Sequence, residues 1–440
     1  MGATPDIRQE IGVEAPAPVR QMSTGADRGL RWYWHLLAFC LAVAIIVSRR
    51  PDALFHAQFF AEDGRCWFAD AYNRGWFVSL FKVQDGYFST LSRLAAALSL
   101  LAPLRDAPLV MNLVGLLVQV LPVSLLISRR LASLGSLRLR CALALMYLAM
   151  PNCIEINVSV EYCQWHMALV ECLLVLASAP RGKIWKTFDC LCLLVAGLAG
   201  PLCLMLLPIS AVYAWARRER WRLVPVAILA FTSAIQLCGL FILDPAIRAR
   251  AHPPLGASFK GLARILAGQI YLGALGLNVS GAAMGKLILA CAALAGTVVL
   301  IYWMFRAKLE FRLFAAFCIL VFAAALRNPF ILSPAGPPPA GMTAWQILAG
   351  TPAIRYWFLP TLMFCWMAVC LAFSVNRLSR WLGAALLFLM FFGIVRNWRY
   401  PALPDMHFET YAQRLETSPK GTGLVIPQNP PGWSMLLVKR

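Results

Sequence analysis

The first apolar segment of the chain is WYWHLLAFCLAVAIIVS at residues 32–48, which leads through Arg49 and Arg50 to the acidic motif FFAEDG at residues 59–64. Residues 32–48 contain no Asp, Glu, Lys or Arg, and they have aromatic residues at the start and arginines at the end, as membrane helices do. No small-residue cleavage site follows them. We therefore expect a retained first membrane helix, with two adjacent carboxylates just beyond it.

The composition is that of a membrane protein. Hydrophobic residues make up 60% of the 440 residues and charged residues 14%, whereas a soluble domain has about 25% charged residues. The mean hydropathy is +0.68. The formal charge of +20 comes from Lys and Arg in short clusters between apolar segments, a topology signal that argues against binding of nucleic acid. The 14 cysteines lack paired spacing, so we expect small core residues and no metal site.

Apolar segments of the size of membrane helices recur along the chain. They lie at residues 32–48, 107–127, 139–151, 163–179, 188–199, 202–216, 223–243, 284–305, 313–332, 356–375 and 381–395. These segments predict an all-α, polytopic membrane bundle of about eleven transmembrane helices.

Basic clusters occur in every second loop of this series. They lie at residues 129–140, 181–186, 217–222, 306–312 and 377–380. If the polar tail, residues 1–30, is disordered in the cytoplasm, this alternation is what the positive-inside rule requires. The rule also favours two short helices over one kinked helix at residues 187–216, where Gly197, Gly200 and Pro201 interrupt an apolar run.

Three long segments then fall on the outer face of the membrane. They are the first loop (residues 49–106), the loop from residue 244 to about residue 283, and the C-terminal tail (residues 396–440), with the helical domain spanning residues 31–395. We expect amphipathic helices at the membrane surface at Leu91–Leu104 and at residues 259–280. The tail combines prolines with a tryptophan, and we expect it to pack back onto the outer loops.

The carboxylates of the first loop are the leading candidates for chemistry. Glu62 and Asp63 lie among Phe and Trp residues, and apolar surroundings raise the pKa of a carboxylate toward values useful to a general base. A transfer onto a hydroxyl group needs one such base, so only one of the two is expected to act. The alternatives are a helix N-cap or a salt bridge to Arg65 or Arg74.

Other polar residues are candidates for lining a substrate path. Tyr87 follows a turn predicted at Asp85 and Gly86, and it could stack on a ligand ring or anchor the loop at the membrane interface. Polar side chains gather again at residues 152–171, which include Glu155, Glu161 and Tyr162. His166 of this group could line an acceptor or proton path, or it could bond to a neighbouring helix.

Arginines stand at two predicted span ends on the outer side. Arg327 and Arg355 carry the planar guanidinium group that suits phosphate, although snorkelling to lipid headgroups is an alternative. Arg355 is followed by Tyr356 and departs from the sidedness rule, which favours a ligand role. The Pro- and Gly-rich residues 334–341 lie between the two arginines, and a mobile loop is expected there.

With this pattern the chain resembles the C-type (GT-C) superfamily of integral-membrane glycosyltransferases, in its topology and in three short stretches. These are residues 58–93, the Arg355-Tyr356 element, and PQNPPGW at residues 427–433. The resemblance implies sugar transfer from a polyprenyl-phosphate or polyprenyl-diphosphate donor to a glycan or lipid acceptor, usually with inversion. It places the reaction on the outer face of a bacterial plasma membrane, among membrane lipids.

By the same resemblance Asp63 is the first choice for the base and Glu62 the second. The candidate substrate-binding residues are Arg355, Tyr356, Arg327, Tyr87, Arg93 and His166. The large folded outer domain of better-known members is replaced here by a short tail, so recognition of the acceptor stays open, as do the cofactors.

Two other classes of protein stay open. A transporter or flippase for lipid-linked glycans would share the polar residues among helices and the basic inner loops, and inverted repeats would indicate it. The acidic motif of the first loop does not recur in the second half of the chain. A polymerase or ligase of surface polysaccharide would share the compartment and the substrate class without needing the acidic base.

Overall fold

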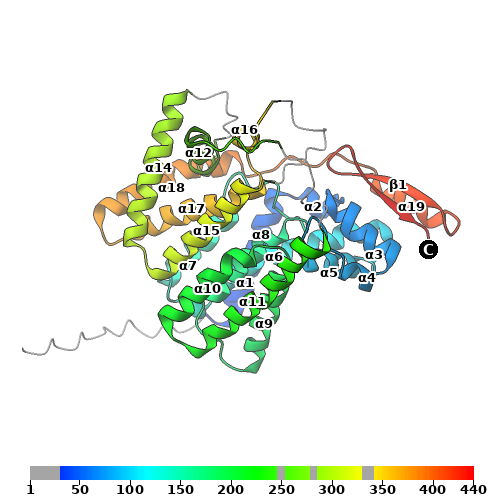
Figure 1. The fold of residues 1–440 in the computed structure, drawn as a ribbon, viewed down its shortest axis with the longest axis horizontal. Helices are drawn as coiled ribbons and strands as arrows, with labels where there is room; N and C mark the ends of the chain where they lie inside the picture. Colours follow the sequence, from blue (N-terminus) through cyan, green and yellow to red (C-terminus); the bar gives the residue numbers. More distant parts are fainter. Residues whose placement is uncertain (1–29, 245–252, 278–284, 330–340) are drawn as a thin grey trace, which may run out of the picture.

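A computed structural model describes residues 30–244, 253–277, 285–329 and 341–440. They form a mostly helical molecule in which every apolar segment predicted from the sequence is a helix (Figure 1). These helices are α1 (Trp32–Arg49), α6 (Ala107–Ile127), α7 (Leu137–Ala149), α8 (Cys163–Leu176), α9 (Lys183–Gly197), α10 (Cys203–Arg217), α11 (Leu223–Cys238), α14 (Lys286–Arg306), α15 (Leu309–Arg327), α17 (Phe358–Ala372) and α18 (Arg377–Arg396). The disorder predicted for residues 1–30 and the loop predicted at residues 334–341 fall outside the described residues, apart from Leu30 and Gly341.

Seven helical segments of the described chain are long and apolar enough to cross a membrane. They contain α1, α6, α11, α14, α15, α17 and α18. Helices α8 and α10 are apolar but shorter. The chain therefore has the helices of a membrane-embedded protein, while a crossing by all eleven segments stays a prediction.

The interrupted run at residues 187–216 forms two helices, as predicted. Helix α9 ends at Gly197 and α10 begins at Cys203, so the break includes Gly200 and Pro201. Both helices pack against α8 and α11. A Cβ atom on Gly197 would overlap the side chain of Thr232 on α11, so the close approach of these two helices needs glycine.

The core of the bundle lies around α6, α8 and α17. Helix α17 packs against α7, α15 and α18, and α6 packs against α1, α7 and α8. Trp366 of α17 is 1% exposed, and its indole N–H donates to the carbonyl of Leu143 on α7 at 3.0 Å. A buried indole needs such an acceptor, so this bond fixes how the two helices pack.

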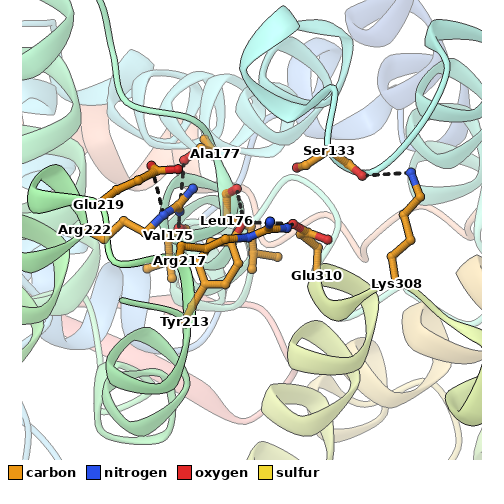
Figure 2. A network of polar contacts seen from close by, with 10 residues as sticks. All are labelled: Ser133, Val175, Leu176, Ala177, Tyr213, Arg217, Glu219, Arg222, Lys308 and Glu310. Carbon is orange, nitrogen blue, oxygen red and sulfur yellow. Dashed lines mark hydrogen bonds and ion pairs between the residues drawn. The ribbon is translucent and has the colours of Figure 1, made fainter. Parts of the chain in front are cut away.

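Three of the basic loops predicted on one side of the membrane, at residues 129–140, 217–222 and 306–312, lie close together (Figure 2). Glu310, at the start of α15, pairs with Arg217 and accepts a hydrogen bond from Tyr213 at 3.0 Å, both at the end of α10. Arg222 donates to the carbonyl of Val175, at 3.2 Å, in the last turn of α8. Lys308 donates to the carbonyl of Ser133 at 3.1 Å. Some of these basic residues therefore bind helix ends, in addition to any topological role.

The first loop is a compact set of short helices beside the bundle. They are α2 (Asp52–Phe55), the π-helical turn η2 (Asp63–Phe68), α3 (Ala69–Arg74), α4 (Trp76–Leu80) and α5 (Thr90–Ser99). Helix α5 accounts for the first part of the helix predicted at Leu91–Leu104, because it ends at Ser99, and it buries Arg93 while leaving Leu94 and Leu98 exposed. Exposed apolar residues on α5 and α4, such as Phe77, suit contact with lipid.

The second predicted outer helix, at residues 259–280, is also helical where it is described. It consists of α12 (Phe259–Ile265), the π-helical turn η8 (Leu266–Tyr271) and α13 (Leu272–Ala274), and α16 (Ala344–Gly350) packs against α12.

The C-terminal tail corrects the all-α prediction. It contains α19 (Phe408–Thr417) and an antiparallel hairpin of β1 (Gly423–Gln428) and β2 (Trp433–Val438), in which Gly423 pairs with Val438 and Gln428 with Trp433. Ile426, Met435 and Leu437 face inward while their neighbours are exposed, which is the alternation of a strand. In Figure 1 the red tail lies beside the blue helices of the first loop. The prediction that the tail packs onto the outer loops is confirmed.

Candidate functional site

The tail holds the acidic motif by backbone pairing. The N–H of Ala61 donates to the carbonyl of Asn429 at 2.6 Å, and the N–H of Asn429 donates to the carbonyl of Phe59 at 3.3 Å. The side-chain amide of Gln428 donates to the carbonyl of Ala61. A Cβ atom on Gly64 would overlap Gln428, so glycine at this position permits the close contact. The tail thus fixes the backbone on both sides of Glu62 and Asp63.

The two carboxylates of the motif meet a third one from the start of α8. The N–H of Glu62 donates to Oε2 of Glu161 at 2.9 Å. The charges of Glu62 and Asp63 both act on the carboxyl group of Glu161. Asp63 is 1% exposed, whereas Glu62 is half-buried. We call Glu62, Asp63 and Glu161 the acidic cluster.

The electrostatics of the acidic cluster follow from burial and from like charge. Burial raises the pKa of Asp63 well above its usual range, and the neighbouring charge of Glu62 adds to this. Burial also raises the pKa of Glu161, with a further increase from the charge of Glu62. Carboxyl groups that interact strongly do not titrate independently, so their apparent pKa values belong to the group as a whole. The cluster can therefore hold or accept a proton closer to neutral pH than an isolated carboxylate.

The salt bridges that were the alternative for these carboxylates are made by other residues. Arg74 pairs with Asp70 at 3.5 Å, and Arg65 lies over the ring of Trp433. Glu62 precedes the turn η2 but its side chain makes no cap hydrogen bond there. Oε2 of Glu62 and Oδ1 of Asp63 are buried and have no hydrogen-bond partner among the described residues. Buried unpaired oxygens are costly and suit a site that receives a ligand or a water.

Arg355 and Tyr356 lie beside this cluster. The guanidinium of Arg355 pairs with Glu155 at 2.7 Å and lies 5.1 Å from the ring centroid of Tyr162 and 5.0 Å from that of Tyr356. Its Nη1 donates to the hydroxyl of Tyr162 at 3.5 Å, and the charge of Glu161, the residue before Tyr162, acts on both Tyr162 and Arg355. The turn that precedes α17 therefore lies close to the acidic cluster.

Tyr87 belongs to the same neighbourhood. Asp85 and Gly86, with φ of 53° and 85°, form the tight turn predicted for them, closed by paired hydrogen bonds of 3.1 Å between Gln84 and Tyr87. Burial raises the pKa of the Tyr87 hydroxyl, which is also within range of the charges of Glu62 and Arg355. Asp85 thus has the structural role expected of it.

Three predicted substrate-binding residues lie elsewhere. Arg93 is fully buried, contacts Asp70 at 3.4 Å and stacks on Trp67, so it supports the first loop. His166 is 2% exposed and uses both ring nitrogens, one with the Tyr147 hydroxyl at 2.8 Å and one with the Ile156 carbonyl at 3.0 Å. Arg327 is exposed at the end of α15. The geometry of Arg93 and His166 favours structural roles.

Arg49 and Arg50 are functional neighbours that the sequence did not single out. Arg49 donates to the carbonyl of Met150 at 2.9 Å and stacks on Tyr400. Arg50 donates to the carbonyl of Asn157 at 2.8 Å, and its charge interacts with that of Asp63. Two arginines at the end of the first helix that the predicted topology places outside depart from the positive-inside rule, a signal that could have identified them.

No family model matches the chain, and a search of curated proteins finds no match. Among the described residues, no three His, Cys, Asp or Glu side chains are grouped as metal ligands. The acidic cluster with its tyrosine and arginine neighbours is therefore the basis for assigning a function.

Proposed function

We propose that the protein transfers a sugar from a polyprenyl-phosphate-linked donor to a hydroxyl group of a cell-envelope glycan or lipid, at the outer face of a bacterial plasma membrane. The observation that carries this proposal is the acidic cluster. Carboxylates from the first loop and from the start of α8 come together next to an arginine and two tyrosines, on a chain built of apolar helices. The resemblance to C-type glycosyltransferases points to the same residues.

The reaction needs a base and an anion-binding group, and no redox chemistry. A carboxylate of the cluster takes the proton of the acceptor hydroxyl, and the hydroxyl oxygen forms a bond to C1 of the sugar. The bond between C1 and the phosphate oxygen breaks, and polyprenyl phosphate leaves with the electron pair. Asp63 is our first choice for the base and Glu62 the second, because burial raises the pKa of Asp63 and so makes its carboxylate a stronger proton acceptor.

The arginine supports the donor half of this proposal. Glu155 and the rings of Tyr162 and Tyr356 hold the guanidinium of Arg355 in one orientation. A donor phosphate would bind next to Glu155 and share the guanidinium with it, and planar paired donors suit a phosphate. Because Glu161 lies within electrostatic range of Arg355, a phosphate held there would lie near this member of the acidic cluster.

Substitution of the acids tests the proposal. The full-length protein is reconstituted in liposomes with a radiolabelled sugar on polyprenyl phosphate and an envelope extract as acceptor, and labelled product is counted. We expect Asp63→Asn or Glu62→Gln to lower the transfer rate by about 10²–10⁴-fold, the usual contribution of a general base. Glu416→Gln, on the exposed face of α19, is the matched control and should transfer at the wild-type rate.

Wild-type rates in both acid variants would remove the proposed base. Two results together would instead favour the flippase. The purified wild-type protein would transfer no sugar, and mutant cells that lack the protein would fail to export lipid-linked glycan.

A further inference from the structure

A groove runs between the start of the first loop and the residues that precede and begin α19. Its volume is about 740 Å³, within the range of roughly 300–1,000 Å³ typical of small-molecule sites. Its walls come from first-loop residues between Asp52 and Gln58, tail residues between Ala402 and Thr410, and the turn before α6. We call it the tail groove.

The tail groove adjoins a second, much smaller cavity, and neither is lined by Glu62, Asp63 or Glu161. A small cavity shares Asp52, His56, Gln58 and Leu403 with the groove and is also lined by Arg50 and Phe60. Its volume is about 10 Å³, roughly the space that one water molecule needs. Asp63 lies near the wall of this cavity, because its N–H donates to the carbonyl of Phe60 at 3.0 Å and its charge acts on Arg50. We call this small cavity the neck. Its volume has room for a hydroxyl group but not for a sugar ring.

Polar atoms around the neck lack partners in the described structure. They are Oδ1 of Asp52, Nε of Arg50 and Oγ of Ser159, all on side chains that line the neck. These three residues are 9%, 6% and 4% exposed. Buried donors and acceptors of this kind are normally satisfied, so a hydroxyl-bearing ligand or an ordered water fits the neck.

The charge of the tail groove selects the kind of ligand. Four carboxylates line it, and the one arginine among its lining residues, Arg105, pairs with Asp106 at 3.7 Å. The four are Asp52, Asp106, Asp405 and Glu409. Such a surface repels a phosphate, so the lipid-linked donor is unsuited to it. Phe55, which is 73% exposed, offers a ring face to a sugar.

We infer that the tail groove binds the acceptor as an uncharged or amine-bearing glycan, and that the neck admits the acceptor's reacting hydroxyl toward Asp63. The inference rests on the proposed function for the reaction itself. It assigns the acceptor and the donor to different surfaces: the acceptor to the acidic groove under the tail, and the donor phosphate to the side of Arg355.

A binding experiment tests the groove without requiring activity. The full-length protein in nanodiscs is incubated with glycans released from the envelope of a strain that lacks it, washed, and analysed by mass spectrometry for retained glycan. Thr410→Trp places an indole in the groove at an exposed position. We expect it to lower glycan retention by about tenfold or more, a loss of roughly 1.4 kcal/mol in binding.

The control is Val425→Trp, which fills a second hollow that is lined by α3 and the tail hairpin and shares no lining residue with the tail groove. Val425 is 60% exposed, so this variant should retain glycan like the wild type. Ala402→Trp, also exposed in the groove, is a second blocking variant in case Thr410→Trp folds poorly.

The groove proposal is overturned if the wild type retains no glycan, or if both blocking variants retain as much as the wild type. If the wild type retains glycan and the blocking variants do not, the groove proposal is supported. If the same wild-type protein leaves the lipid-linked donor intact, the proposed transferase activity is overturned. The failure of one proposal is therefore distinguishable from the failure of the other.

Discussion

At the scale of single residues, the chemistry depends on how three carboxyl groups share one buried site. Asp63 and Glu161 have raised pKa values because burial penalises their charged forms and Glu62 adds like charge. Arg50 is close enough to counter part of this at Asp63. Such a site stays protonated to higher pH than exposed carboxylates do, and this suits proton transfer. When the protons leave, the stability of the folded protein falls.

The pH dependence of stability should report this site. The folded protein binds protons at Asp63 and Glu161 more tightly than the unfolded chain does, so its stability falls as pH rises from the usual carboxyl range toward the raised pKa values. Glu161→Gln keeps an oxygen acceptor for the Glu62 N–H but cannot ionise. We expect the melting temperature of this variant, measured in detergent, to fall less between pH 4.5 and 8 than that of the wild type.

Glu416→Gln serves as the control for this experiment, and it should follow the wild-type curve because Glu416 is exposed. Parallel curves for the wild type and Glu161→Gln would mean that Glu161 is not protonated in the folded state.

At the scale of elements, the tail hairpin and the first loop act as one unit. The backbone of Asn429 pairs with Phe59 and Ala61, and Asn73 on α3 accepts from the N–H of Val438 at 2.9 Å. Ile426 and Met435 pack with Phe59 in a small apolar core of their own. The acidic motif therefore depends on residues at the far end of the chain for its backbone conformation.

Gly64→Ala should loosen this unit. The added methyl group would overlap Gln428, which is 2% exposed and cannot swing away without losing its bond to the Ala61 carbonyl. We expect a cost of about 1–3 kcal/mol, as is typical of overpacking, and faster tryptic cleavage at Lys420. Gly350→Ala is the control, because nothing lies within 4 Å of its added Cβ. Equal cleavage rates in the two variants would show that the tail does not depend on Gly64.

At the scale of the whole molecule, the two ends of the bundle differ in kind. One end carries basic loops whose arginines and lysines bind helix ends and acids (Figure 2). The first loop and the tail lie together beside the bundle (Figure 1), with Phe77 exposed on α4 and with Phe81 and Leu101 exposed just after α4 and α5. This arrangement agrees with a basic cytoplasmic end and a working face at the outer leaflet.

Two epitope tags test this sidedness. One is placed after Arg440 and the other after Gly182, which is exposed and whose surroundings leave room for an insertion. Protease added outside spheroplasts should remove the C-terminal tag and leave the tag at Gly182 intact until the membrane is permeabilised. Removal of both tags, or of the Gly182 tag alone, from intact spheroplasts would contradict the proposed topology.

The sequence by itself determined the features that depend on local composition and periodicity. Apolar runs gave the helices, Gly200 and Pro201 ended one of them, and Asp85 with Gly86 formed the predicted turn. The prominence of Glu62 and Asp63 was also visible, because two adjacent acids are rare in so apolar a chain. The β hairpin was missed because its inward alternation covers only a few residues and is interrupted by the prolines at residues 427–431.

Only the tertiary structure decided which residues share a site. Glu62 meets Glu161 across 99 positions of the sequence, Arg355 meets Glu155 across 200 and Gln428 meets Ala61 across 367. Helix packing brings these pairs together, and no short-range pattern encodes it. For the same reason the sequence left two roles open for His166, lining a substrate path or bonding to a neighbouring helix. The structure shows its Nδ1 atom hydrogen-bonded to the hydroxyl of Tyr147. Local propensities select helices, while the partners of a buried polar group follow from how the helices are packed.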